Sequence, residues 1–249
     1  MTERTPLRGK TALITGGSRG LGRAMVLAFA DAGATVVVAS RKHDLGEDVV
    51  RAVEQRGGRA AYHAVDVSRW NQLDGLVDET LDRFGRIDVL VNNVGKSPPY
   101  DRLADVDEAY FDAVCAVNLK GPFRLAVLVS EAMAAGGGGS IVNVSSSASA
   151  RPEPLALPYA AAKAGLETVT KGLATAYAPT VRVNAIVPGP FRTDVSRAWD
   201  PERTADLAAR TLLRRIAEPE EIIGAALYFA SDWSSYTTGA LLAVDGGSV

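Results

Sequence analysis

Residues 11–40 read TALITGGSRGLGRAMVLAFADAGATVVVAS, and this stretch decides the fold. Two short apolar runs, residues 11–15 and 35–40, flank a segment with the period of a helix. The apolar side chains of that segment recur every three or four residues: Leu21, Ala24, Met25, Ala28, Phe29 and Ala32. They form one buried stripe, and Gly33 provides the C-terminal stop. The stretch therefore predicts a strand, a helix and a second strand in succession.

The same alternation continues along the chain. The predicted strands cover Thr11–Thr15, Thr35–Ser40, Ala60–Asp66, Val89–Asn92, Ser140–Ser145, Val181–Pro188 and Leu241–Asp245. Further helices are predicted over Leu45–Gln55, Trp70–Phe84, Asp107–Ala135, Tyr159–Ala178 and Pro219–Ala230. Several strands are apolar on consecutive residues, as is typical of strands covered on both faces. The pattern predicts one α/β domain over residues 1–249: a Rossmann-type, doubly wound parallel sheet of about seven strands with helices on both faces.

The composition of the chain argues against several classes of function. The chain has 249 residues, 47% of them hydrophobic, and 27 Lys+Arg against 29 Asp+Glu give a formal net charge of −2. This balance gives no electrostatic footprint for nucleic acid or an anionic membrane. One cysteine, Cys115, and two histidines exclude an internal disulfide and a His-rich or multi-thiolate metal site, so no metal is expected. Residues 1–10 are polar, and no run approaches the ~18 apolar residues of a membrane span, so a cytoplasmic protein is expected.

A glycine-rich turn joins the first predicted strand to the first predicted helix. It reads TGGSRGLG over residues 15–22, with the spacing Gly-x3-Gly-x-Gly. Glycines at such a turn let the backbone approach a phosphate and point amides of the helix N-terminus at it. The predicted cofactor-binding residues here are Gly16, Ser18, Arg19, Gly20, Leu21 and Gly22.

The residues at the end of the second predicted strand indicate which nicotinamide cofactor is bound. An acidic residue there hydrogen-bonds the ribose 2′-hydroxyl, whereas an arginine accommodates a 2′-phosphate. This strand ends in Ser40-Arg41 with no carboxylate, and Arg19 is expected to reach the same area. Two cations and a hydroxyl suit a dianion, so the sequence predicts NADP(H), with NAD(H) as the weaker alternative.

Tyr159 and Lys163 are spaced to do acid–base chemistry. Their i, i+4 spacing puts the phenol and the ammonium on one face of a helix. An ammonium about 4 Å away would lower the phenol pKa from its usual ~10 toward neutrality, where proton transfer is most efficient. Asn118 adds a second indication: Pro122 has no N–H, so the carbonyl of Asn118 is left available to a water molecule.

With these motifs in order, the chain resembles the short-chain dehydrogenase/reductase family from Lys10 to Gly247. The matching pieces are residues 15–22, Asp66-Val67, NNVG at 92–95, Asn118, VNVSS at 142–146, Tyr159 with Lys163, Asn184, Pro188-Gly189, Thr193 and the terminal Asp245-Gly246-Gly247. One departure is Val94, where the family usually has alanine.

The resemblance implies roles for these residues. Tyr159 is expected to be the catalytic acid/base, Ser146 to hydrogen-bond the substrate oxygen, and Lys163 to hold the nicotinamide ribose and lower the tyrosine pKa. Asn118 is expected to hold a water in a proton relay to that lysine. Cofactor contacts are expected from Asp66 and Val67 at the adenine, from Asn93 and Gly95 along the cofactor, and from Pro188, Gly189 and Thr193 on the nicotinamide side.

The substrate is expected to lie against Lys96–Tyr100, Ala148–Pro158 and a lid at about residues 190–211. The apolar lining residues would be Pro152, Leu155, Leu157, Phe191 and Trp199. The leading interpretation is an NADP(H)-dependent oxidoreductase that interconverts a small ketone and a secondary alcohol. The alternatives are a 3-oxoacyl-[acyl-carrier-protein] reductase and, from another class, a non-catalytic NADP-binding sensor or scaffold. A homo-oligomer, tetramer or dimer, is expected from the family.

Overall fold

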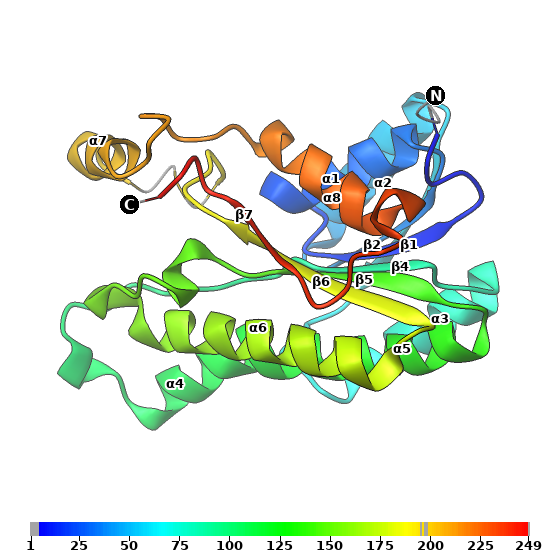
Figure 1. Ribbon diagram of the computed structural model, residues 1–249, viewed down its shortest axis with the longest axis horizontal. Helices are drawn as coiled ribbons and strands as arrows, with labels where there is room; N and C mark the ends of the chain where they lie inside the picture. Colours follow the sequence, from blue (N-terminus) through cyan, green and yellow to red (C-terminus); the bar gives the residue numbers. More distant parts are fainter. Residues whose placement is uncertain (1–4, 195, 197–198, 249) are drawn as a thin grey trace.

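The structure is a computed structural model that describes residues 5–194, 196 and 199–248. Its seven strands are β1 (Thr11–Thr15), β2 (Thr35–Ser40), β3 (Arg59–Ala64), β4 (Val89–Asn92), β5 (Gly139–Val144), β6 (Val181–Pro188) and β7 (Leu241–Val244). Its α-helices are α1 (Gly20–Asp31), α2 (His43–Gln55), α3 (Gln72–Phe84), α4 (Glu108–Cys115), α5 (Gly121–Ala135), α6 (Leu157–Tyr177), α7 (Pro201–Ala209) and α8 (Ile223–Ala230). Figure 1 labels them along the chain.

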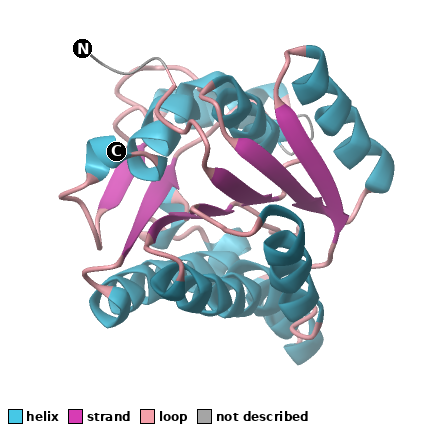
Figure 2. Ribbon diagram, turned by 90° about the vertical axis from the view of Figure 1, so that its right-hand side faces the viewer, coloured by secondary structure: helices cyan, strands magenta, loops and turns pink. Residues whose placement is uncertain are grey.

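All seven strands join one parallel sheet in the order β3-β2-β1-β4-β5-β6-β7. The chain builds outward from β1 to β3 and then returns to the other side of β1 with β4. This reversal opens a crevice at the carboxyl ends of β1 and β4, which is where open α/β sheets bind ligands. The predicted doubly wound sheet is confirmed, and Figure 2 shows it between two layers of helices.

The sheet is buried by apolar side chains on both faces. On one face Phe29 of α1, Val53 of α2 and Phe229 of α8 pack against alternate residues of the central strands. On the other, Leu76 of α3 and Val129 of α5 belong to a second cluster that also includes α6 residues. Figure 1 shows the same division, with α1, α2 and α8 above the sheet and α3, α5 and α6 below it. Burial on both sides explains why the strands are apolar on consecutive residues.

Two helical segments differ from the prediction. The helix expected over 107–135 is interrupted by a π-helical turn at Ala116–Lys120, in which the amide of Gly121 donates to the carbonyl of Ala116. Pro122 has no amide to give, so the helix widens there by one residue instead of simply kinking. Helix α7 was not predicted. It lies within the expected lid, of which Val195, Arg197 and Ala198 fall outside the described residues.

Among the described residues, one helical stretch, Glu108–Ala135, is long and apolar enough to cross a membrane by length and composition alone, although charged residues interrupt its apolar runs. Its α5 part packs against α3 and α6 in the second cluster, and Leu125, Val129 and Met133 are almost completely buried. Packing beneath the sheet therefore accounts for the apolar composition of this helix.

Candidate active site

The predicted site residues gather at one edge of the sheet. The glycine turn follows β1, Arg41 follows β2, Asp66 follows β3, Gly95 follows β4, Ser146 follows β5 and Gly189 follows β6. Because parallel strands share a direction, their carboxyl ends meet at the same edge. Helix α6 adds Tyr159 and Lys163, and the π-helical turn adds Asn118.

The glycine turn presents bare backbone for a phosphate. Gly16 has φ +66°, which favours glycine, and a Cβ on Gly22 would lie 2.1 Å from the carbonyl oxygen of Gly16. Asn93 holds this turn in place, since its side-chain amide donates to the carbonyl oxygens of Thr15 at 3.1 Å and Gly16 at 3.3 Å. The turn leads directly into α1, whose first amides face the same crevice.

The end of β2 has the chemistry expected for a ribose phosphate. The Ser40 hydroxyl is buried and has no hydrogen-bond partner, so it is an orphaned polar group beside the crevice. Arg41 follows it, with Nη1 3.9 Å from Oδ2 of Asp66. Burial works to raise the pKa of Asp66, but hydrogen bonds from Ser68 and the charges of Arg41 and Arg69 hold it below its usual value. Asp66 therefore stays ionised and orients Arg41.

Arg19 lines a groove of about 910 Å³ along the outer side of α1, together with Gly20, Leu45 of α2 and Thr193. Arg19 is exposed and makes no side-chain capping bond to α1. That Arg19 joins Arg41 at a bound 2′-phosphate stays a prediction.

The side chain of Asn118 hydrogen-bonds the backbone of the segment that follows β4. Its side-chain oxygen accepts from the amide of Lys96 at 3.1 Å, and its nitrogen donates to the carbonyl oxygens of Lys96 and Val114, both at 2.8 Å. These bonds fix the segment after β4. A Cβ added to Gly95 would lie 3.4 Å from Asn118 Oδ1 and 3.6 Å from Lys163 Nζ, so Gly95 brings bare backbone next to the lysine.

Tyr159, near the start of α6, lies near Ser146, which is half-buried just after β5. The Ser146 hydroxyl accepts from the amide of Ala148 at 3.2 Å. Burial raises the pKa of Tyr159, and the nearby Ser146 hydroxyl partly offsets that rise. The expectation that the lysine brings this pKa toward neutrality is wrong for the protein alone: Lys163 Nζ lies 5.7 Å from the centre of the tyrosine ring.

Lys163 is almost completely buried, with 2% of its surface exposed. Its ammonium donates to the carbonyl oxygen of Val144, the last residue of β5, at 2.7 Å. Burial lowers the pKa of Lys163 to about 8. The group is thus a charge held in a poorly solvated place beside Gly95 and Tyr159, as expected of a lysine that serves a bound ligand.

Gly189 and Thr193, the residues expected on the nicotinamide side, lie next to Asp245 and Gly20, respectively. The amide of Gly189 donates to the carbonyl oxygen of Val244 at 3.1 Å, and a Cβ there would lie 2.7 Å from the Cα of Asp245. Thr193 lies against the glycine turn, because a Cβ on Gly20 would be 3.4 Å from Thr193 Cβ. Phe191, expected in the substrate lining, instead belongs to the core and is 5% exposed.

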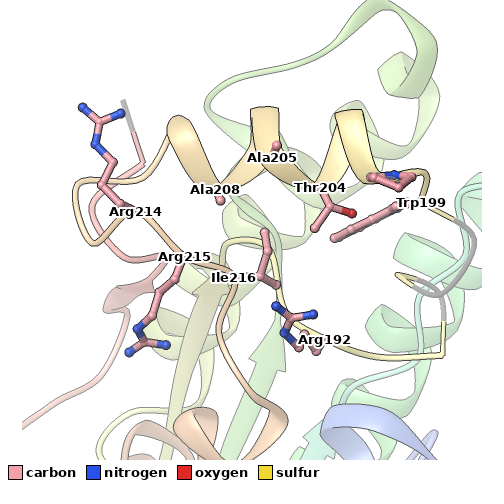
Figure 3. A pocket seen from close by; sticks show the side chains of 9 residues that line it. Arg192, Trp199, Thr204, Ala205, Ala208, Arg214, Arg215 and Ile216 are labelled. Carbon is pink, nitrogen blue, oxygen red and sulfur yellow. The ribbon is translucent and has the colours of Figure 1, made fainter.

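Helix α7, which lies in the segment predicted to be a lid, is linked to the loop before α6 by ion pairs. It has no buried residue, but Glu153, in the loop before α6, lies 3.2 Å from Arg210 and 3.7 Å from Arg203 of α7. The opposite face of α7 borders a cavity of about 470 Å³, which is lined by Arg192, Trp199, Pro201, Thr204, Ala205, Ala208, Arg214, Arg215 and Ile216. Figure 3 shows Ile216 between α7 and Arg192. These ion pairs of Glu153 could not be predicted from the sequence, because Arg203 and Arg210 lie 50 and 57 residues further along the chain.

A buried polar network behind the site was also missed. The side chain of Asn92 donates to Asn143 Oδ1 at 3.0 Å, and Asn143 donates to Thr170 Oγ1 at 2.9 Å. These three side chains join β4, β5 and α6. Their polar character inside otherwise apolar segments was the available signal, since buried polar groups need partners.

Comparisons with known proteins agree with this geometry. A family described as enoyl-(acyl carrier protein) reductase matches residues 16–248. The 3-oxoacyl-[acyl-carrier-protein] reductase of Thermotoga maritima is 38% identical, over 98% of this chain and 99% of its own. A Sinorhizobium meliloti protein described as a short-chain alcohol dehydrogenase superposes with a TM-score of 0.94, at 36% identity over 99% of this chain and 100% of its own. A Beutenbergia cavernae protein with NADP bound at low occupancy gives 0.93, at 35% identity over 98% of each chain.

The chain belongs to the short-chain dehydrogenase/reductase family. It is an oxidoreductase of alcohol and carbonyl groups that uses a nicotinamide cofactor.

Proposed function

We propose that the protein is an NADP(H)-preferring reductase or dehydrogenase of small ketones and secondary alcohols, with Tyr159 as its acid/base. The buried Lys163 carries this proposal: its ammonium is bonded to Val144, two residues before Ser146, and lies 5.7 Å from the centre of the Tyr159 ring at the carboxyl edge of the sheet. The cofactor, when bound, supplies or accepts the hydride.

The chain's own side chains then handle the oxygen and its proton. A substrate carbonyl oxygen held between Ser146 and Tyr159 would accept hydrogen bonds from both hydroxyl groups. Tyr159 donates its proton to that oxygen during reduction and takes it back during oxidation. Lys163 stabilises the resulting phenolate by its positive charge, and the bond to Val144 keeps the ammonium in place.

The preference for NADP(H) is supported by the end of β2. The orphaned hydroxyl of Ser40 and the guanidinium of Arg41 suit a 2′-phosphate, and no acidic side chain follows β2 directly to accept from a ribose diol. The relative with bound NADP is consistent with this choice.

A carrier-bound 3-oxoacyl group is the second candidate substrate, because the Thermotoga maritima reductase is similar over nearly its whole length. We favour a small free substrate, since the sequence shows no cluster of cations before β5 or after α6 to steer an acidic carrier. Turnover of a 3-oxoacyl group on carrier protein far above that of its free ester would reverse this order. The homo-oligomer and the cytoplasmic location stay predictions from the resemblance.

The decisive experiment replaces Tyr159 with phenylalanine. The ring and its packing are kept and the proton donor is lost, so NADPH should still bind while turnover of a panel of ketones falls below a few per cent. NADPH oxidation, followed by absorbance, measures turnover, and fluorescence titration measures binding. Activity near that of the wild type would show that Tyr159 is not the acid/base. Tight NADPH binding by the wild type with no turnover of any ketone would favour the non-catalytic sensor.

A further inference from the structure

Glu167 lies on α6 one turn after Lys163 and reaches back to the loop that carries Ser146. Its Oε1 accepts from the hydroxyl of Ser145 at 2.7 Å and from the hydroxyl of Ser149 at 2.5 Å. A single carboxylate oxygen therefore holds a side chain on each side of Ser146. The family comparison assigns no role to this glutamate.

The two serines hold the backbone of Ser146 from both directions. The amide of Ser145 donates to the carbonyl oxygen of Ile186 in β6 at 2.8 Å, and the Ser145 side chain is buried. The Ser149 hydroxyl also lies 2.7 Å from the carbonyl oxygen of Ser146. The backbone amide of Ser149 also donates to the carbonyl oxygen of Ser146 at 3.0 Å, so the acceptor that Glu167 offers to the Ser149 hydroxyl fixes a residue that is itself bonded to Ser146.

We propose that Glu167 is a positioning residue, which keeps Ser146 in contact with Tyr159 by binding Ser145 and Ser149. Tyr159, Lys163 and Glu167 occupy successive turns of α6, at intervals of four residues. The carboxylate thereby ties the helix that carries the acid/base to the loop that carries its serine partner. This inference rests on the proposed roles of Tyr159 and Ser146.

The geometry indicates that the length of the Glu167 side chain matters more than its charge. Glu167→Gln keeps the length and an Oε1 that accepts from both serines, so kcat should stay within about threefold of the wild type. Glu167→Asp keeps the charge but is shorter by one methylene, and the serines lose their common acceptor. Because a misplacement of about 1 Å can cost up to ~10²-fold, kcat of Glu167→Asp should fall tenfold or more. The Kd for NADPH should change less than twofold in both variants.

A variant cycle separates positioning from general stabilisation. The double variant Ser145→Ala with Ser149→Ala removes the two donors, and kcat should fall by about the same factor as in Glu167→Asp. Adding Glu167→Asp to that double variant should then cost less than twofold. The double variant also tests the same contact from the other side if Glu167→Asp fails to fold. Glu131→Asp is the matched control, since Glu131 accepts from the hydroxyl of Tyr177 at the far end of α6 at 2.7 Å, and its kcat should not change.

Three results would overturn the inference. Glu167→Asp could keep the kcat of the wild type, or Glu167→Gln could lose as much kcat as Glu167→Asp. In the third case, adding Glu167→Asp to the double serine variant would lower kcat by the same factor as it does in the wild type. Failure of the proposed function is distinguishable, because it would appear as activity in Tyr159→Phe or Ser146→Ala whatever the Glu167 variants do.

Discussion

Replacing Arg41 with alanine tests the cofactor preference directly. Arg41 follows β2, its side chain is 63% exposed, and Nη1 lies 3.9 Å from Asp66. A charge-assisted hydrogen bond contributes about 1.5–3 kcal/mol. We expect the lower end of that range, because water and the Asp66 carboxylate both weaken the field of the guanidinium. Since a factor of ten corresponds to about 1.4 kcal/mol, the Kd for NADPH should rise about tenfold in Arg41→Ala.

The same substitution should leave NADH nearly unaffected, because NADH has no 2′-phosphate. Fluorescence titration of both cofactors at low salt gives the ratio of the two Kd values, which should also shrink as salt is added. The double variant Ser40→Asp with Arg41→Ala supplies an acceptor for the ribose diol and repels the phosphate, so the preference should reverse. Arg51→Ala is the control: it removes the same charge from α2, where Arg51 pairs with Asp48. Wild-type Kd values for NADPH and NADH that agree within threefold would refute the reasoning.

Two further predictions concern the lid and the buried lysine. Glu153→Gln weakens the ion pairs with Arg203 and Arg210. Because exposed ion pairs contribute about 0.2–1 kcal/mol each, KM should rise about two- to fivefold at low salt and less at high salt. Glu202→Gln on the same helix is the control, and an unchanged KM in Glu153→Gln would contradict the lid contact. Burial lowers the folded-state pKa of Lys163 to about 8 from 10.5. Between these pH values the unfolded chain therefore binds more protons than the folded protein. The free energy of unfolding should rise with pH over this range, by about 3 kcal/mol in all. Urea unfolding at several pH values should show this rise in the wild type and not in Lys163→Met; equal slopes in the two proteins would exclude it.

Sequence periodicity was sufficient for the sheet, because the central strands β1, β2 and β4 are buried on both faces and are therefore mostly apolar. The observed strand ends differ from the predicted ones by one or two residues where polar residues follow a strand. Asp66, for example, was predicted to end the third strand but lies beyond the end of β3. The π-helical turn was indicated by Pro122, but its form depends on bonding within the folded helix. Helix α7 escaped detection because it is short and contributes no residue to the core.

The site was predictable where a motif sets a local geometry, as in the glycine turn and the i, i+4 pair of Tyr159 and Lys163. Contacts between distant segments were not, as the ion pairs of Glu153 with Arg203 and Arg210 show. The pKa of Tyr159 was also misjudged, because the sequence showed the nearby lysine and not the desolvation of the phenol. Glu167 went unnoticed for a similar reason: its partners are two serines about twenty residues earlier in the chain.

Helix α7 has a consequence for how this chain can diversify. Most severe losses of stability come from changes in the core, whereas surface substitutions usually change the free energy of unfolding by less than about 0.5 kcal/mol. Since α7 has no buried residue, most of its sequence can drift without threatening the fold. Libraries confined to residues 201–209 should therefore yield many folded proteins with altered substrate preference. The same number of changes in β5 or α6 would yield few.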